Sequence, residues 1–262
     1  MAAPLAAAPA LADKAGCLAV RGQKMPRKLV ALTLAGARKS ELANAWARLG
    51  FAPDRSGEAI ALSDGVALAF FAADDAAAAA VGDLQARAFL AYFAGRLSGA
   101  AMLTLAGSPQ ECGAARPEPF GGADCFVILA PPRHKTAPAQ PNGVTGLKTL
   151  VAVAESPADH AEALTHLTGQ HEMLATSAGL EIALEGGTAL AVLSPLAFAF
   201  RYGFAAPESG AFRIAGLVFR VGDLSATEKF LERKGVEPKI QAGRLIARPG
   251  EGAGVAVAFE QD

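Results

Sequence analysis

Residues Gly146 to Gly169 read GLKTLVAVAESPADHAEALTHLTG and contain, in order, a strand, a capped turn, a helix and a helix stop. Leu147–Val153 is short and rich in Leu and Val, which is typical of a buried strand. Ser156 followed by Pro157 is a helix-start pattern, and Gly169 is a helix-end pattern. The stretch therefore predicts one strand–helix unit.

Similar units recur along the chain at nearly equal spacing. The strand end and the helix-ending glycine are Leu34 and Gly50, Val153 and Gly169, and Val221 and Gly235. A more divergent copy lies between Met102 and Leu129. Short apolar segments after each helix, beginning with Phe51–Asp54, are typical of further strands. Because internal repetition outweighs any single motif, the sequence predicts an α+β fold of four tandem βαβββ modules.

The segment Pro131–Gly143 contains four prolines and an Asn-Gly pair, which is typical of a linker. We therefore expect two halves, residues 26–135 with modules 1 and 2 and residues 143–262 with modules 3 and 4, joined by a linker at residues 136–142. Residues 1–25 are rich in alanine and precede the first predicted strand. We expect a disordered leader there; a signal and a misassigned start stay open.

The composition excludes several classes of protein. A net charge of -1 and the lack of a long Lys/Arg cluster argue against nucleic acid and anionic membranes as partners. No apolar run reaches the length of a transmembrane helix. The three cysteines are irregularly spaced, which suits a reducing compartment, so we expect a cytoplasmic protein.

The repeat resembles the vicinal oxygen chelate superfamily, which includes glyoxalase I, bleomycin-resistance proteins and extradiol dioxygenases. The resemblance rests on the following phrases, of which the last three are similar to phrases in glyoxalase-like members: Val221-Gly222-Asp223-Leu224, Lys234-Gly235-Val236, Pro141–Gly146, Leu193–Phe198 and Phe200–Gly203. It implies two cupped mixed β-sheets with helices packed outside and a small molecule held in a cup. A homodimer is also compatible with the resemblance.

The resemblance further implies a divalent metal, with a His ligand from a first strand and a Glu ligand from a last strand. The expected positions fall on Leu29, Lys148 and Gly216 for His, and near Ala191 and Val257 for Glu. None of these is an ordinary metal ligand. From the residues we predict no bound cofactor, while the resemblance leaves a divalent metal open. Glu260 becomes the carboxylate ligand if the alignment shifts by three residues.

Two cations in otherwise apolar strands point to an anion site. Lys148, Arg220 and Arg244 are all charges within such strands and must reach water, a partner or a cavity, and Lys148 and Arg220 are the two assigned to the site. By strand alternation Lys148 shares a side with Leu150 and Ala152, and Arg220 lies on the side of Val218, both facing the cup in the alignment. The sequence thus predicts a cup lined by these two cations, and exposed charges at strand ends or edges are the alternative.

Three more residues are candidates for ligand binding. Arg201 and Tyr202 are adjacent and can add a pair of hydrogen-bond donors. His134 lies in Arg133-His134-Lys135-Thr136, which resembles a phrase after the cup-facing strand of glyoxalase-like proteins, and an ordinary loop residue is the alternative.

Three functions stay open on the sequence alone. One is a glyoxalase-like module that binds a small oxygenated or anionic molecule without the usual metal ligands, as bleomycin-resistance proteins do. Another is a metal-dependent lyase or dioxygenase. The third is a catalytically inactive structural or interaction partner. Whether the protein is an enzyme is undecided by these residues, because superfolds host many functions.

Overall fold

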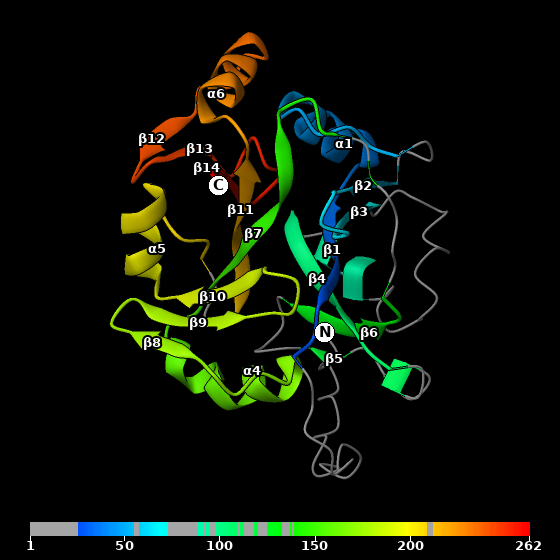
Figure 1. The fold of residues 1–262 in the computed structure, drawn as a ribbon, viewed down its shortest axis with the longest axis vertical. Helices are drawn as coiled ribbons and strands as arrows, with labels where there is room; N and C mark the ends of the chain where they lie inside the picture. The colour runs from blue at the N-terminus through cyan, green and yellow to red at the C-terminus, as the bar shows by residue number, and fades with distance from the viewer. Residues whose placement is uncertain are drawn as a thin grey trace, which may run out of the picture.

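The computed structural model describes residues 26–54, 58–72, 89–91, 93–94, 98–108, 111–112, 118–119, 125–132, 137, 139–208 and 212–262. The expected leader, residues 1–25, and the candidate His134 lie outside the described residues. The described chain forms two mixed β-sheets with helices around them (Figure 1). None of the described helices is long and apolar enough to cross a membrane.

The first sheet has the strand order β2-β3-β1-β4-β6-β5. Its strands are β1 (Leu29–Gly36), β2 (Ala59–Ala61), β3 (Ala67–Ala72), β4 (Gly99–Ala106), β5 (Glu118–Pro119) and β6 (Phe126–Ala130), with helix α1 (Lys39–Arg48) after β1. Strand β3 runs parallel to β1, β6 runs parallel to β4, and β1 and β4 pair antiparallel.

The second sheet has the strand order β12-β13-β14-β11-β7-β10-β9-β8. Its strands are β7 (Val144–Val153), β8 (Leu174–Thr176), β9 (Gly179–Ala183), β10 (Ala189–Leu193), β11 (Arg213–Val221), β12 (Lys239–Gln241), β13 (Arg244–Ala247) and β14 (Ala256–Gln261). Its helices are the short 3-10 helix η2 (Pro157–His160), α4 (Ala161–Thr168), α5 (Pro195–Tyr202) and α6 (Leu224–Arg233).

The second sheet consists of two copies of one unit. In the first copy β7 leads through α4 to β8, β9 and β10, and β10 returns parallel to β7. In the second copy β11 leads through α6 to β12, β13 and β14, and β14 returns parallel to β11. Strands β7 and β11 pair antiparallel and join the copies. This is the βαβββ order predicted for residues 143–262, and the α+β class is confirmed.

The first unit of the chain departs from the predicted pattern. Phe51–Asp54, predicted as a strand, is irregular. This segment makes side-chain contacts in place of strand pairing. The backbone N–H of Ala52 donates to the side chain of Gln140, and the Phe51 ring packs edge-on against Trp46. After α1, the described residues therefore contain two strands, β2 and β3, instead of the three expected.

The start of the second half also differs in detail from the prediction. The hydroxyl of Ser156 makes no capping hydrogen bond, and residues 157–160 form the 3-10 turn η2 before α4 begins. Gly169 does end α4 as predicted, in the left-handed conformation with φ of 70°.

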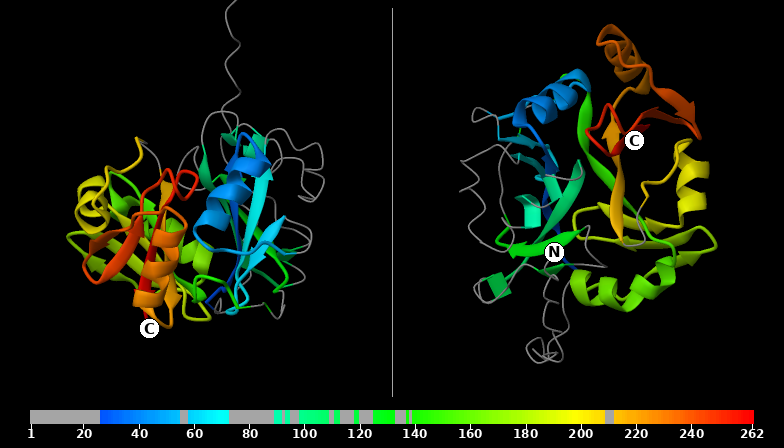
Figure 2. Two further views of the ribbon diagram at one scale, coloured as in Figure 1. Left: turned by 90° about the horizontal axis from the view of Figure 1, so that it is seen from above. Right: turned by 180° about the vertical axis from the view of Figure 1, so that it is seen from behind.

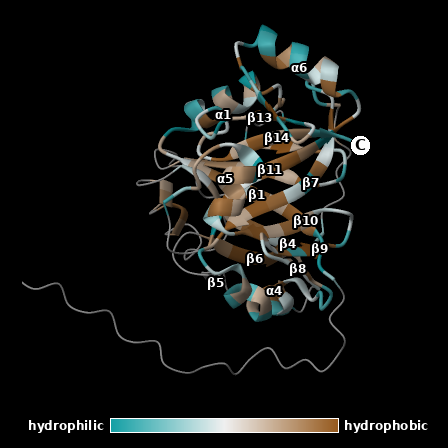
Figure 3. Cartoon of the chain, turned by 90° about the vertical axis from the view of Figure 1, so that its left-hand side faces the viewer, coloured by the Kyte–Doolittle hydropathy of each residue, from teal (hydrophilic) through white to brown (hydrophobic). Residues whose placement is uncertain are grey.

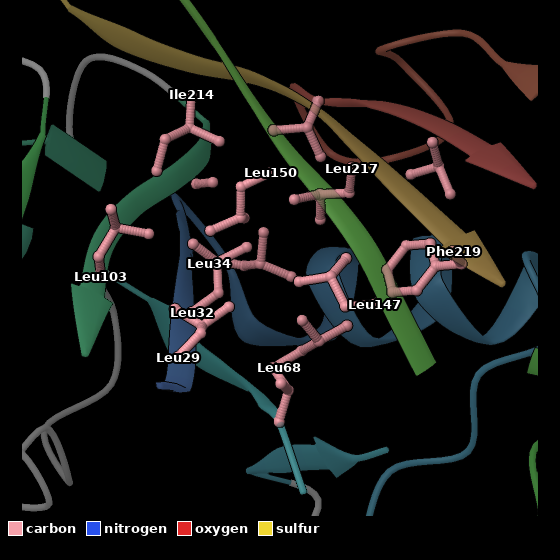
Figure 4. Packing of buried hydrophobic residues seen from close by; sticks show 14 of the residues in the cluster. Leu29, Leu32, Leu34, Leu68, Leu103, Leu147, Leu150, Ile214, Leu217 and Phe219 are labelled. Atoms are coloured by element: carbon pink, nitrogen blue, oxygen red, sulfur yellow. The ribbon is translucent and has the colours of Figure 1, made fainter. Parts of the chain in front are cut away.

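One continuous apolar core fills the space between the two sheets (Figure 4). Strand β1 contributes leucines that face leucines of β7 and β11, and helices α1, α4 and α6 contribute side chains at its margin. Members of this core include Leu29, Trp46, Phe51, Leu147, Leu150, Ala152, Phe219, Val257 and Phe259. Figure 2 shows the sheets side by side, and Figure 3 shows that hydrophobic residues concentrate in the strands and hydrophilic ones in α4 and α6.

The two sheets are also joined by polar contacts at their junction. The carboxylate of Asp64, in the β2–β3 turn, accepts hydrogen bonds from the backbone N–H groups of Val66 at 3.0 Å and Leu147 at 2.7 Å. The side chain of Lys28 donates to the backbone carbonyl of Asp64. A hairpin of the first sheet is thus fixed to the first strand of the second.

Candidate functional site

Helix α5 covers the face of the second sheet opposite to the shared core. Its residues Phe198 and Tyr202 are buried and stack on each other, with ring centroids 4.8 Å apart. They pack in a separate apolar cluster with Val151, Val153, Val218, Ala256 and Ala258. We call this surface of the sheet the α5 face. Its centre is apolar and is filled by the helix, while polar groups gather at one end.

A charged cluster at this end joins three strands of the sheet. The Glu260 carboxylate of β14 accepts a hydrogen bond from the Lys148 ammonium of β7, with Nζ 2.5 Å from Oε1. It accepts another from the Arg244 guanidinium of β13, with Nε 2.7 Å from Oε2. The side chain of Lys148 is 37% exposed, that of Glu260 is 24% exposed and that of Arg244 is 26% exposed, so each is partly shielded from water.

The cluster lies on the α5 face because of the strand alternation of its neighbours. Ile246, two residues from Arg244, and Ala258, two residues from Glu260, both belong to the apolar cluster under α5. Side chains two apart on a strand point to the same face. Arg244 and Glu260 therefore continue the α5 face beyond its apolar centre.

Lys148 reaches this face through an irregularity in β7. The pairing of β11 with β7 shifts, so that Val218 faces Thr149 while Phe219 faces Leu147, and Lys148 is the extra residue. Such a bulge resets the alternation. The prediction that Lys148 shares a side with Leu150 and Ala152 was therefore wrong, because those two residues lie in the core between the sheets.

The electrostatics keep the central carboxylate ionised. Burial raises the pKa of Glu260, but the hydrogen bonds from Lys148 and Arg244 outweigh burial and leave this pKa below its usual range. At neutral pH Glu260 is consequently a fixed counter-ion and a poor proton acceptor. The cluster formed by Lys148, Glu260 and Arg244 carries a formal charge of about +1.

The two cations retain unused hydrogen-bond donors. An ammonium has three donors and a guanidinium five. Within the described part of the chain, Glu260 is the acceptor for one Lys148 donor and for the Nε–H of Arg244, and no acceptor is found for the terminal nitrogens of Arg244. The arrangement can therefore bind an anion without first breaking an internal bond.

Arg220 lies on the same face but belongs to a different pair. It stands opposite Glu260 in the parallel register of β11 and β14. Its guanidinium instead donates to the backbone carbonyl of Gly187 and lies 3.6 Å from the carboxylate of Asp262. The structure thus brings Lys148 and Arg220 to neighbouring strands, with Arg220 oriented toward the sheet end.

Tyr202 is close enough to the cluster to be influenced by its charges. Burial raises the pKa of the Tyr202 hydroxyl to about 12, while the positive charges of Arg244 and Arg201 oppose this rise and Glu260 adds to it. The phenol is accordingly neutral at physiological pH. Arg201 is half-buried on the same helix. Of the pair predicted from the sequence, Tyr202 is buried between α5 and the sheet near the cluster, and Arg201 precedes it in the last turn of α5.

The residues at the expected metal positions do not fit a divalent ion. Leu29 and Val257 lie in the shared core, and Gly216, which has no side chain, lies next to Phe198. Both oxygens of Glu260 already bind cationic groups. Among the described residues, no group of three or more His, Cys, Asp or Glu side chains is placed to hold a metal.

Arg244 is recognised in the sequence as a charge within an apolar strand, but it was not predicted as a site residue. The available signal was a charged residue within an otherwise apolar strand, the same signal that identified Lys148. What the sequence does not show is that β13 lies beside β14, which brings Arg244 to Glu260.

Two surface cavities lie away from the cluster. One, of about 190 Å³, is lined by η2, the β8–β9 turn and Ser194. The other, of about 360 Å³, lies between Pro141–Gly143 and α6, with Phe230 and Arg233 on its wall. Neither contacts Lys148, Glu260 or Arg244.

No family model and no curated protein matches the sequence. Solved structures do match in shape. A xylose isomerase-like TIM barrel/4-hydroxyphenylpyruvate dioxygenase fusion protein superposes with a TM-score of 0.57 and 12% identity, over 90% of this chain and 49% of that one. A triple mutant of 4-hydroxymandelate synthase from Streptomyces coelicolor superposes with a TM-score of 0.59 and 14% identity, over 90% of this chain and 93% of that one.

The chain spans about half the length of the fusion protein and almost all of the synthase. At these identities the likeness concerns the fold. Together with the paired βαβββ units of the second sheet, it shows that the chain has the fold of the vicinal oxygen chelate superfamily.

Proposed function

We propose that the protein binds a small anionic molecule, without a metal ion, at the cluster of Lys148, Glu260 and Arg244. The observation that carries this proposal is the pair of partly shielded cations that share one carboxylate and keep unused donors. The cluster lies on the α5 face, the side of Val218, which the resemblance predicts to face the cup; Leu150 and Ala152, predicted to face it as well, lie in the shared core instead.

Charge and geometry favour a carboxylate or another oxyanion as the ligand. A guanidinium offers two parallel N–H groups to a planar anion, and hydrogen bonds between charged groups are about twice as strong as neutral ones. Partial shielding from water strengthens the attraction further. Because Glu260 is anionic and Tyr202 is buried, Lys148 and Arg244 are the groups of the cluster that offer positive charge and hydrogen-bond donors to an anionic ligand.

Calorimetric titration with inorganic sulfate and a panel of small carboxylates tests the proposal. The double variant Lys148→Met/Arg244→Met should lose the binding seen with the wild type, since both cationic donors are removed. The matched control is Lys229→Met/Arg248→Met, which removes one lysine and one arginine from exposed positions and should bind like the wild type. Unchanged binding by the first variant would contradict the proposal.

A structural or interaction role is the second candidate function. It is favoured by the filling of the α5 face, where Phe198 and Tyr202 cover the apolar centre and the charged end is partly exposed. In that case none of the anions binds the wild type, and Lys148→Met/Arg244→Met changes thermal stability alone. A metal-dependent lyase or dioxygenase is the weaker alternative, because both oxygens of Glu260 are engaged by cations.

A further inference from the structure

The Glu260 carboxylate binds Lys148 and Arg244 in the way that the carboxylate of a ligand would. One oxygen accepts from Lys148 at 2.5 Å and the other accepts from Arg244 at 2.7 Å. The carboxylate thus bridges the pair, and an external anion held by the unused donors of Lys148 and Arg244 would lie close to its negative charge. A second carboxylate, Asp262, ends the same strand and pairs with Arg220.

We propose that Glu260 is an internal competing anion, which lowers the affinity of the Lys148–Arg244 pair for external anions. This inference rests on the proposed function, because it assigns the regulation of that same site. It contrasts with a role in which Glu260 orients the two cations and thereby raises their affinity for an anion.

The anchoring of the two cations supports competition over orientation. Lys148 is fixed by the bulge in β7, between the core residues Leu147 and Leu150. Arg244 starts β13, whose next residues Leu245 and Ile246 are buried. Both side chains therefore originate from well-packed backbone that does not depend on Glu260. What Glu260 adds is a negative charge within hydrogen-bond distance of both donors.

The size of the effect follows from the charge that is removed. Two unit charges about 4 Å apart interact by about 1 kcal/mol in water and by more when partly shielded. Removing the Glu260 charge should therefore tighten the binding of an anion by about fivefold or more. The near-isosteric change Glu260→Gln removes this charge and keeps the length of the side chain.

Isothermal titration of inorganic sulfate into the intact protein tests the inference. Sulfate is a suitable probe because its charge is constant over the neutral pH range. Glu260→Gln should bind sulfate about fivefold or more tightly than the wild type. Glu232→Gln, which makes the same change in net charge at an exposed position of α6, should leave the affinity unchanged. If Glu260→Gln does not fold, Glu260→Asp replaces it, with an expected affinity above that of the wild type because the shorter side chain cannot reach both cations.

The outcomes separate this inference from the proposed function. Equal or weaker binding by Glu260→Gln, with binding to the wild type lost in Lys148→Met/Arg244→Met, overturns the competing role and leaves the proposed function intact. If Glu260→Gln binds tightly and still does so after Lys148→Met and Arg244→Met are added, the anion binds elsewhere. That result overturns both the competing role of Glu260 and the proposed function. Absence of sulfate and carboxylate binding in the wild type and in Glu260→Gln also overturns both.

Discussion

Gly146 lies where the β2–β3 turn of the first sheet contacts strand β7 of the second through polar groups. A Cβ atom added to it would lie 2.6 Å from Oδ2 of Asp64, closer than van der Waals contact permits. Asp64 cannot move aside freely, because its two oxygens accept hydrogen bonds from Val66 and Leu147. The absence of a side chain at residue 146 therefore permits the contact between the β2–β3 turn and β7.

Gly146→Ala should lower the free energy of unfolding by about 1–3 kcal/mol, because the new methyl group displaces the Asp64 carboxylate from the backbone N–H of Leu147. Chemical denaturation measures this change. The control is Gly222→Ala, whose added Cβ meets nothing within 4 Å and should cost less than about 0.5 kcal/mol. Equal effects for the two variants would disprove the steric explanation.

At the scale of elements, α5 presents apolar side chains on two sides. Ser194 caps its first turn by accepting a hydrogen bond from the backbone N–H of Ala197, and Gly203 ends it in the left-handed conformation. Phe198 is fully buried on the inner side, while Phe200 is 82% exposed on the outer side. The helix is thus an integral cover of the α5 face, with its apolar contribution concentrated in Phe198 and Tyr202.

Two substitutions of the same residue type in α5 should have very different consequences. Phe198→Ala leaves a cavity over the sheet and should destabilise the protein by about 3–5 kcal/mol. Phe200→Ala removes an exposed ring and should change the stability by less than about 0.5 kcal/mol. Thermal or urea unfolding measures both. If Phe198→Ala does not fold, Phe198→Leu keeps the comparison. Similar effects of Phe198 and Phe200 substitutions would mean that α5 does not cover the sheet as described.

At the scale of the whole molecule, Arg27 connects segments from both sheets. Its backbone N–H donates to the carbonyl of Thr168, and its carbonyl accepts from the backbone N–H of Glu185. Its buried guanidinium donates to the carboxylate of Glu111, at 2.7 Å, and to the carbonyl of Ala106. The hydrogen bond from Arg27 is the main reason that the pKa of Glu111 falls from 4.5 to about 2.

This pair predicts a component of acid sensitivity. Because the pKa of Glu111 is lower in the folded than in the unfolded protein, its contribution to stability is present above pH 4.5 and is lost as the pH falls toward about 2. Glu111→Gln should therefore reduce the melting temperature at pH 6, and its difference from the wild type should shrink between pH 4.5 and 2. A difference that is independent of pH would show that the ion pair does not contribute.

The fold class and the paired units were predictable because local patterns repeat. The apolar strands and glycine stops of Gly146–Gly169 and Val221–Gly235 depend on neighbours a few residues apart, whereas the predicted cap at Ser156 did not form. The strand predicted at Phe51–Asp54 was wrong because the local sequence does not distinguish a short strand from an irregular segment. Here the segment is irregular, and Phe51 packs edge-on against Trp46. The division into halves and the count of four modules stay predictions.

The candidate site was only partly predictable. Lys148, Arg220 and Glu260 are recognisable in the sequence as charges in or at the end of apolar strands, and Tyr202 and Arg201 as neighbouring donors. The ion-pair partner of each charge could not be predicted, because the bulge at Lys148 and the order β13-β14-β11-β7 depend on strand pairing between distant segments. Lys148 and Glu260 bind across an intervening strand although 112 residues separate them.

The sequence by itself determined the α+β class, the βαβββ order of residues 143–262 and the lack of ordinary metal ligands at the expected positions, because these follow from residue types and local periodicity. Only the tertiary structure decided that α5 fills the face of the second sheet and that Glu260 is bonded to Lys148 and Arg244. Both depend on which distant segments pack together, and a bulge of one residue is enough to change the face on which a charge lies.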